Sequence, residues 1–305
     1  MLPAPASDRA GAGSQCPVTV VIPTYERVAP LTATLAHVRA CNPAPAQIIV
    51  HVDNGDRSTA AALNDLAGPD LKVLYAQSRQ GPGGGRNRAI AAARHEIIVS
   101  LDDDSYPVDA DFFARVLALF GEYPQAAVIG TAIFHRGEAI AADERRVQLA
   151  PDFVGCGCAY RRTAFLATHG YQPIALAYGV EEVDMALQLH DQESTILASP
   201  WLRIRHETDR QHQINAAVTA AHIRNTALLA WLRYPLELTP LGMAQVGSRV
   251  WWSVRNGRFN GVLTGLITIA STIWRFRRQR APVRKETVAK YRKLRQMAAI
   301  HQTAQ

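Results

Sequence analysis

Short apolar runs alternate with amphipathic stretches along the first part of the chain. The runs are rich in Val and Ile, which is typical of strands buried on both faces of a sheet. The stretches between them have apolar residues at helical spacing, as in residues 30–40 and in residues 58–66, where Ser58 is the expected N-cap. This alternation predicts a mainly parallel, Rossmann-like α/β sheet with right-handed crossovers. The predicted strands are residues 17–23, 47–52, 71–76 and 97–101.

Beyond residue 120 the pattern becomes less regular. Residues 138–149 are polar and lack a clear period, and we interpret them as a mobile loop. The remaining elements of the α/β part are predicted as strands at residues 126–134, 153–160, 195–198 and 201–206, and as helices at residues 110–120, 161–169 and 178–190.

The chain changes in kind at residue 215, after which it is helical and has tryptophans among arginines. Residues 261–274 form an apolar run of 14 residues. A helix that crosses a bilayer needs about 20 residues, so this run is too short to span a membrane. Two interpretations stay open. The run is either an apolar helix packed on the body, or a segment lying in the membrane interface with Trp and Arg at headgroup level.

The net charge of +7 is concentrated at the C-terminal end. From Ser271 onward there are 10 Lys and Arg against one acid, Glu286, so the other 23 basic and 25 acidic residues nearly cancel. A basic end of this kind predicts an anionic partner, and we expect a membrane surface and no nucleic acid. We divide the chain into a disordered tail (residues 1–16), an α/β domain (residues 17–212) and a helical, membrane-associating region (residues 213–305).

The four cysteines, Cys16, Cys41, Cys156 and Cys158, make neither a disulfide framework nor a zinc-ligand spacing. We expect them to be reduced, as in a cytoplasmic protein. With the basic end, this predicts a cytoplasmic protein held peripherally on the inner face of the cell membrane.

Three adjacent carboxylates, Asp102, Asp103 and Asp104, follow the buried strand at residues 97–101. Ligands of open α/β sheets bind beyond the carboxyl ends of strands, and adjacent carboxylates repel one another unless a cation neutralises them. A hard divalent ion, Mg²⁺ or Mn²⁺, usually with a phosphate, is the natural partner. The alternative is an acidic helix start, because Asp109 and Asp111 follow and lie at the start of the next predicted helix.

Three further groups carry candidate chemistry. A glycine run from Gly81 leads to Arg86 and Asn87, where a phosphate or ribose can approach the backbone, and it partly imitates a dinucleotide fingerprint. Glu181 and Glu182, at a helix start, either interact only with the helix dipole or include a general base. His206, at a strand end, is either a metal ligand or a structural histidine.

Six motifs occur in the order found in family 2 glycosyltransferases with the GT-A fold, which the chain resembles over residues 18–206, with a weaker similarity at residues 224–235. They are Val18–Arg27, Val52–Gly55, Gly81–Asn87, Leu101–Asp104, Gly155–Arg162 and Tyr178–Asp184. The resemblance implies an inverting, metal-dependent transfer of sugar from a nucleoside-diphosphate sugar to a hydroxyl of a glycan or lipid-linked acceptor. It also implies a divalent metal cofactor, Mn²⁺ or Mg²⁺.

The same resemblance implies a role for each matching residue. Glu182 corresponds to the catalytic base, with Glu181 beside it. Apart from the resemblance, the polar composition of residues 138–149 suggests a loop that closes over the donor. The donor contacts implied are Pro23, Thr24 and Glu26 around the nucleoside, Asp53 on the base, Gly81, Arg86 and Asn87 beside the nucleotide, and Asp102 and Asp103 on the nucleotide sugar. The implied metal ligands are Asp102, Asp104 and His206.

Three positions depart from the family pattern. Glu26 stands where Asn is more common, Gly85 where Ala is usual, and Glu181-Glu182 replaces a Glu-Asp pair, so the choice of base between the two stays open. Two other functions are also considered. One is a nucleotide-dependent oxidoreductase built on the Gly81 loop, which the triple Asp argues against. The other is a non-catalytic nucleotide-sugar-binding protein, which the carboxylates at 102, 104 and 182 disfavour.

Overall fold

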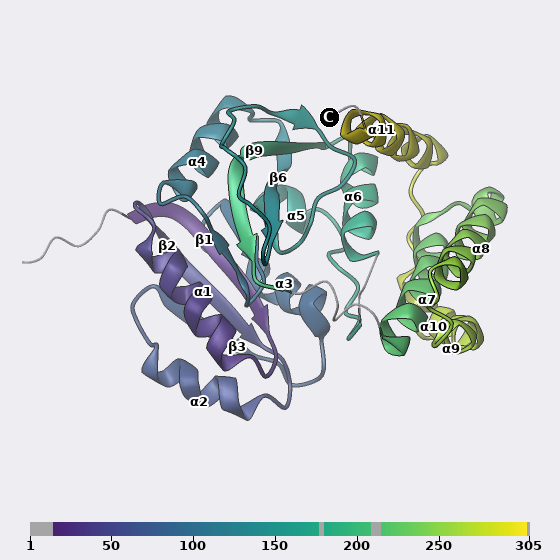
Figure 1. The fold of residues 1–305 in the computed structure, drawn as a ribbon, viewed down its shortest axis with the longest axis horizontal. Coiled ribbons are helices and arrows are strands. Elements are labelled where there is room, and N and C mark those ends of the chain that lie inside the picture. The colour runs from purple at the N-terminus through teal and green to yellow at the C-terminus, as the bar shows by residue number, and fades with distance from the viewer. Residues whose placement is uncertain (1–14, 177–179, 209–214, 304–305) are drawn as a thin grey trace, which may run out of the picture.

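A mixed sheet with helices on both faces carries a separate layer of C-terminal helices (Figure 1). The computed structural model describes residues 15–176, 180–208 and 215–303. The predicted tail over residues 1–14 lies outside these residues. So do Tyr178 and Gly179 of the sixth motif and the predicted domain boundary after residue 212.

The strands follow the spatial order β3-β2-β1-β4-β8-β6-β9-β5, and β7 pairs with β9 beside this path. Their bounds are β1 Gln15–Thr24, β2 Ala44–Val52, β3 Leu71–Tyr75, β4 Ile97–Leu101, β5 Ser105–Pro107, β6 Ala126–His135, β7 Gln148–Leu149, β8 Gly157–Arg161 and β9 Thr195–His206. The parallel pairing predicted for β1 to β4 is confirmed. The second half is mixed, because β8 runs antiparallel to both β4 and β6.

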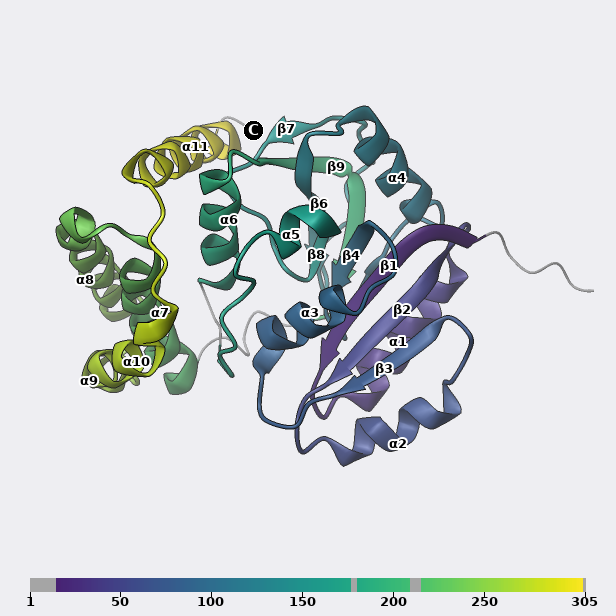
Figure 2. The same ribbon diagram turned by 180° about the vertical axis from the view of Figure 1, so that it is seen from behind.

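Helices cover both faces of this sheet (Figure 1, Figure 2). α1 (Val28–Ala40), α2 (Arg57–Asp65) and α4 (Phe112–Glu122) pack on one face, and α3 (Gly81–Ala91), α5 (Arg162–Leu166) and α6 (Glu181–Asp191) on the other. Alternation along β1 explains the two cores: Val20 and Ile22 join the cluster of Leu35 from α1, whereas Val21 joins that of Ile90 from α3.

Several predicted boundaries are corrected by contacts between distant parts of the chain. β1 begins at Gln15, so Gln15 and Cys16 pair with β2 and do not belong to a disordered tail. The cap of α2 is Asp56 and not Ser58, because the Asp56 carboxylate accepts the backbone N–H of Thr59 at 2.9 Å. The two predicted strands at residues 195–198 and 201–206 are one strand, β9, with a register shift against β6.

The acidic residues before α4 do not act as simple helix caps. Asp111 is at the N-cap of α4 but its side chain makes no capping hydrogen bond. Asp109 instead accepts the Nε–H of Arg203 in β9 at 2.9 Å. The segment at residues 138–149, predicted as an irregular loop, is irregular apart from β7.

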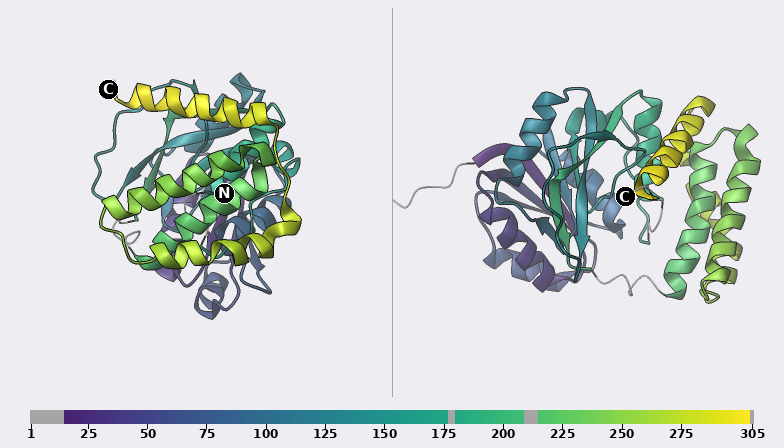
Figure 3. Two further views of the ribbon diagram at one scale, coloured as in Figure 1. Left: turned by 90° about the vertical axis from the view of Figure 1, so that its right-hand side faces the viewer. Right: turned by 45° about the horizontal axis from the view of Figure 1, so that its top comes forward.

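The C-terminal helices form a layer beside α6 (Figure 1, Figure 3). They are α7 (Ala216–Arg233), α8 (Thr239–Arg255), α9 (Val262–Ile267), α10 (Ile269–Phe276) and α11 (Lys285–Thr303). α8, α9 and α10 pack on α7, and α11 returns to α6. The apolar run at residues 261–274 is thus divided between α9 and α10. Among the described residues, no helix is long and apolar enough to cross a membrane.

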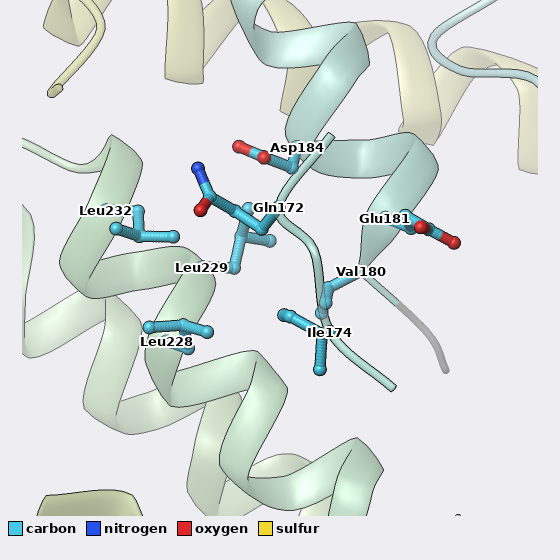
Figure 4. A pocket seen from close by; sticks show the side chains of 8 residues that line it. All are labelled: Gln172, Ile174, Val180, Glu181, Asp184, Leu228, Leu229 and Leu232. Atoms are coloured by element: carbon cyan, nitrogen blue, oxygen red, sulfur yellow. The ribbon is translucent and has the colours of Figure 1, made fainter. Parts of the chain in front are cut away.

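A buried ion pair joins α6 to this layer. Asp184 of α6 accepts hydrogen bonds from the Nε–H and Nη2–H of Arg233, whose side chain is fully buried at the end of α7. The Arg233 guanidinium also donates to the backbone carbonyl of Ala281 at 3.2 Å. Figure 4 shows the apolar pocket next to this pair. Leu228, Leu229 and Leu232 of α7 line one side of it, and Ile174 and Val180, which precede α6 in the sequence, line the other.

The glycine run is the first turn of α3 and not a loop before it. Gly81 has a positive φ of +67°, and an added Cβ there would overlap the backbone carbonyl of Ile174. A Cβ at Gly85 would lie 2.8 Å from Nδ1 of His51 and 3.0 Å from Cβ of Pro23. The buried imidazole of His51 therefore fills the space that an alanine at position 85 needs.

We predict that Gly85→Ala lowers the free energy of unfolding by about 1–3 kcal/mol, because the added methyl group overpacks against His51. In a His51→Ala background the same change should cost much less, since the imidazole is gone. Urea unfolding of the wild type, both single variants and the double variant measures this coupling. Strictly additive effects would contradict the assignment of His51 as the obstacle.

Candidate active site

A cavity of about 810 Å³ lies at the carboxyl ends of β1, β2 and β4. This is the edge at which open α/β sheets bind their ligands. Eleven of the residues predicted for the site line it together: Pro23, Thr24, Asp53, Gly81, Arg86, Asp102, Asp103, Asp104, Glu181, Glu182 and His206. Segments far apart in the sequence thus converge on one cavity.

Two predicted donor-binding residues are not among those that line this cavity. Glu26 is exposed in the turn after β1, with a positive φ of 56°, and its backbone N–H donates to Asp56. Asn87 uses its side-chain amide to hold Tyr171, donating to the carbonyl at 2.8 Å and accepting the N–H at 2.9 Å. Asn87 therefore holds the backbone at Tyr171 against α3.

The three adjacent carboxylates point to different partners. Asp102 accepts a hydrogen bond from the guanidinium of Arg86. Asp103 accepts from the hydroxyl of Thr24 at 2.8 Å and from Nε–H of Arg27 at 2.7 Å. Asp104 is paired with the Arg27 guanidinium and with Nε2 of His206, 3.1 Å from its Oδ1. Two arginines and a histidine therefore offset the mutual repulsion of the turn.

Burial and charge act differently on these groups. Burial raises the pKa of Asp103 to about 7, although Arg27 and Thr24 oppose the shift. Burial also opposes ionisation of Asp104, but its hydrogen bond to His206 and the charges of His206 and Arg27 hold its pKa below the usual value. Burial would lower the pKa of His206, but the hydrogen bond to Asp104 and the charge of Asp102 raise it.

Two of the three predicted metal ligands, Asp102 and His206, come together with Cys156 in one group of ligand atoms. Ligand atoms of Asp102, Cys156 and His206 lie within 4.8 Å of one another, and Asp104 contacts His206 directly. Carboxylate oxygens and an imidazole nitrogen fit Mn²⁺ or Mg²⁺, so the residues present suit the implied metal. Cys156 was not expected at a metal site, because the cysteines lack a zinc-ligand spacing, but its Sγ is 3.6 Å from Nδ1 of His206. Its place in the fifth motif was the available signal.

The two glutamates that begin α6 have different surroundings. Oε1 of Glu182 accepts the backbone N–H of Gly155 at 3.2 Å, and this half-buried carboxylate lines the cavity. Glu181 is buried against the first turn of α3, where an added Cβ at Gly83 would overlap its Oε1. This Oε1 has no hydrogen-bond partner in the part of the chain that the structure describes. In Figure 4, Glu181 points away from the leucines of α7.

Burial also raises the pKa of both glutamates. It raises that of Glu181 to about 8, with Arg86 opposing the shift and Glu182 adding to it. The pKa of Glu182 is raised for the same reason, while its own backbone N–H, Arg86 and the Gly155 N–H oppose the change.

Asp53 anchors the start of α3. Its carboxylate accepts the backbone N–H groups of Gln80 at 2.9 Å and Gly81 at 3.0 Å. These are N–H groups that a dinucleotide-binding turn would offer to a pyrophosphate. Since a carboxylate of the chain already holds them, the structure gives no support to an oxidoreductase built on the glycine run.

Three cationic or aromatic residues of the cavity were not predicted to have a role. Arg27 bridges Asp103 and Asp104, and Arg79 lies over the ring of Tyr25, with Cζ 3.6 Å from the centroid. Tyr25 and Arg27 belong to the first motif, which was the signal available for them. Arg79 precedes the glycine run and matched no predicted element.

The comparisons with known proteins agree with this geometry. Residues 19–166 match the model of the family described as glycosyl transferase family 2. A curated relative is GalNAc(5)-diNAcBac-PP-undecaprenol beta-1,3-glucosyltransferase of Campylobacter jejuni, 28% identical over 90 residues. That alignment covers 28% of this chain and 29% of the relative, so less than a third of the relative's length is matched.

Solved structures with a similar fold are also glycosyltransferases. A Pyrobaculum calidifontis mannosyltransferase in complex with GDP-Man and Mn²⁺ has a TM-score of 0.58 and 16% identity, covering 84% of this chain and 75% of that one. GalNAc-T7 with UDP, GalNAc and Mn²⁺ has a TM-score of 0.57 and 15% identity, with coverages of 72% and 48%. S. aureus TarS with UDP-GlcNAc has a TM-score of 0.54 and 15% identity, with coverages of 70% and 66%.

At these identities the solved structures establish the fold, which is the GT-A fold with a helical C-terminal region. The family model identifies the domain that carries the cavity, from β1 through α5. Residues 19–166 of this chain belong to glycosyl transferase family 2.

Proposed function

We propose that the protein is an inverting, metal-dependent glycosyltransferase that moves a sugar from a nucleoside-diphosphate sugar to a hydroxyl of a glycan or lipid-linked acceptor. One observation carries this proposal: a single cavity is lined by Asp102, Asp104 and His206 together with the carboxylate of Glu182. A group that binds a charged leaving group and a group that accepts a proton are thus available to one substrate. We assign residues 17–212 to catalysis and residues 213–305 to membrane association.

Asp102, Asp104 and His206 would hold the Mn²⁺ or Mg²⁺. When bound, the metal supplies positive charge that offsets the charge on the departing nucleoside diphosphate. The Mn²⁺ in two of the similar structures supports this assignment. Arg86, buried beside Asp102, adds a fixed positive charge at the same end of the cavity. Asp53 and the Tyr25–Arg79 pair line the cavity near the start of α3, where we place the nucleoside.

We assign the base to Glu182 and not to Glu181. A pKa of about 8 keeps Glu181 protonated at neutral pH, so it is a poor proton acceptor. The Gly155 N–H orients the Glu182 carboxylate, and the raised pKa of Glu182 strengthens it as a base. Glu182 would take the proton of the acceptor hydroxyl as that oxygen attacks the anomeric carbon from the side opposite the diphosphate, which inverts the configuration.

We also propose that the acceptor is lipid-linked and that the protein acts at the inner face of the cell membrane. The name of the Campylobacter jejuni relative describes an undecaprenol-diphosphate-linked acceptor, which supports a similar acceptor here. The basic C-terminal end of this chain supports attachment to an anionic surface.

The first test is a thermal-shift panel of nucleoside diphosphates and sugar nucleotides, each with Mn²⁺, Mg²⁺ or EDTA. A ligand at about 100 times its Kd should stabilise the protein by about 2.7 kcal/mol. We expect a shift with one class of sugar nucleotide that EDTA abolishes and that His206→Ala weakens. A shift with NAD(P) alone, independent of metal, would contradict the proposal.

Glu182→Gln should lower kcat by about 10²–10⁴-fold, because the variant cannot accept the acceptor proton. Donor binding in the thermal-shift assay should remain, since the amide keeps the shape of the carboxylate. Glu181→Gln is the matched control and should retain much more activity. A larger loss in Glu181→Gln than in Glu182→Gln would reverse the assignment of the base.

Glu181 should also make stability depend on pH. The folded protein keeps this proton up to a pKa of about 8, whereas the ordinary value is 4.5. Between these values the folded state binds more protons, so the free energy of unfolding falls as pH rises. Urea unfolding at several pH values within this window should show a flatter dependence for Glu181→Gln. The exposed control Glu286→Gln should behave as the wild type, and equal slopes in all three proteins would refute the prediction.

A further inference from the structure

The helices from α8 to α10 lie in a part of the chain without acidic residues. Between Glu237 and Glu286 there are eight Arg, one Lys and no Asp or Glu. Arg284 and Lys285, at the end of this stretch, form ion pairs with acidic residues outside it. The seven arginines from Arg249 to Arg280 make no ion pair with the described residues, so their positive charge is available to an anionic surface.

The same helices turn apolar stripes to solvent. On α8 the exposed stripe is Met243, Gly247, Trp251 and Val254, and along α9 and α10 it is Leu263, Ile267, Ala270 and Trp274. Both stripes follow the helical spacing i, i+4, i+7 or i+8, i+11, so each lies on one side of its helix.

Two glycines fix which sides face outward. A Cβ at Gly242 of α8 would lie 2.6 Å from Cβ of Ala230, and one at Gly265 of α9 would lie 2.9 Å from Cβ of Ile223. Both neighbours belong to α7, so the glycine sides of α8 and α9 are seated closely on that helix. Figure 3 shows these helices as the layer farthest from the sheet.

The apolar residues of this layer are strongly exposed. Six of them are between 64% and 71% exposed, namely Met243, Trp251, Phe259, Leu263, Ile267 and Trp274. Single exposed apolar residues are common, but two exposed stripes on helices packed against α7, with exposed Phe259 between them in the chain, mark an interaction surface. We call these six residues, with Arg255, Arg275 and Arg278, the outer helical face.

Trp and Arg side chains are paired along the same layer. Arg258 lies 4.8 Å from the ring of Trp252, and Arg277 lies 4.0 Å from that of Trp274. These amphipathic side chains suit the level of lipid headgroups, where an apolar body meets water and phosphate. A protein partner would need an acidic rim around an apolar centre, whereas an anionic bilayer offers both over any area.

We infer that the outer helical face is a membrane-docking surface, which lies in the interface of an anionic bilayer without crossing it. The apolar stripes enter the headgroup region and the arginines bind lipid phosphates.

This surface also orients the active site, a step that rests on the proposed function. Asn225 of α7 donates to the carbonyl of Leu176 at 2.8 Å, and Ala175 and Leu176 line the cavity. α7 therefore contacts both the cavity wall and the membrane-docking helices. A lipid-linked acceptor in the bilayer would approach the cavity from the side of this wall.

Flotation of the full chain with vesicles tests the inference. The vesicles are phosphatidylcholine with or without phosphatidylglycerol, and we expect binding to the anionic vesicles that added salt weakens. A triple variant, Trp251→Ser, Leu263→Ser and Trp274→Ser, should lower the partition coefficient by about tenfold or more. The matched control Tyr75→Ser with Leu149→Ser removes exposed apolar residues elsewhere and should float as the wild type.

The charges are tested separately. Arg255→Glu with Arg278→Glu should reduce flotation with anionic vesicles, and Arg57→Glu on α2 is its control. Unchanged flotation in both outer-face variants would overturn the inference. So would a dimer in solution that the triple variant abolishes, because the face would then bind a second copy. Metal-dependent donor binding, measured without vesicles, reports on the proposed function alone, so the two failures can be told apart.

Discussion

Electrostatic repulsion within the turn after β4 is the constraint on which the rest of the site depends. Three consecutive carboxylates have to be neutralised at the end of a buried strand, and the fold supplies the cations from two directions. Arg27 arrives from the turn after β1, and Arg86 arrives from the second turn of α3. The positions of β1, α3 and β4 are thus tied to one another by charge as well as by apolar packing.

Close backbone packing is the second requirement, and it explains why glycines begin α3. Gly83 leaves room for the carboxylate of Glu181, and Gly85 leaves room for His51. The same crowding excludes water from Glu181, and the loss of hydration is the main cause of its high pKa. The close packing at Gly83 and the high pKa of Glu181 therefore have the same origin. Any side chain added at Gly83 would displace the Glu181 carboxylate.

Periodicity and motif order predicted the parallel half of the sheet and most of the residues that line the cavity. They failed where contacts depend on distant partners. Nothing local marks β8 as antiparallel, because its direction is set by pairing with β4 and β6. Arg27 and Cys156 reach the site only through the tertiary fold. The hydrogen bond from Asn87 to Tyr171 spans 84 residues, so the local sequence could not indicate that Asn87 has this partner. The glycine run was misjudged as a loop because glycine has low intrinsic helix propensity.

Because of the ion pair between Asp184 and Arg233, the α/β domain cannot be separated from α7 without a large loss of stability. A fragment that ended before Arg233 would leave Asp184 buried and unpaired in the helix that carries Glu182. Losing one partner of a buried pair costs about 3–5 kcal/mol, a large share of the stability of an ordinary domain. The shortest useful fragment for crystallisation or engineering therefore includes all of α7. Substitutions on the exposed sides of α8 to α10 leave this ion pair intact, whereas substitutions at the end of α7 reach the helix that carries Glu182.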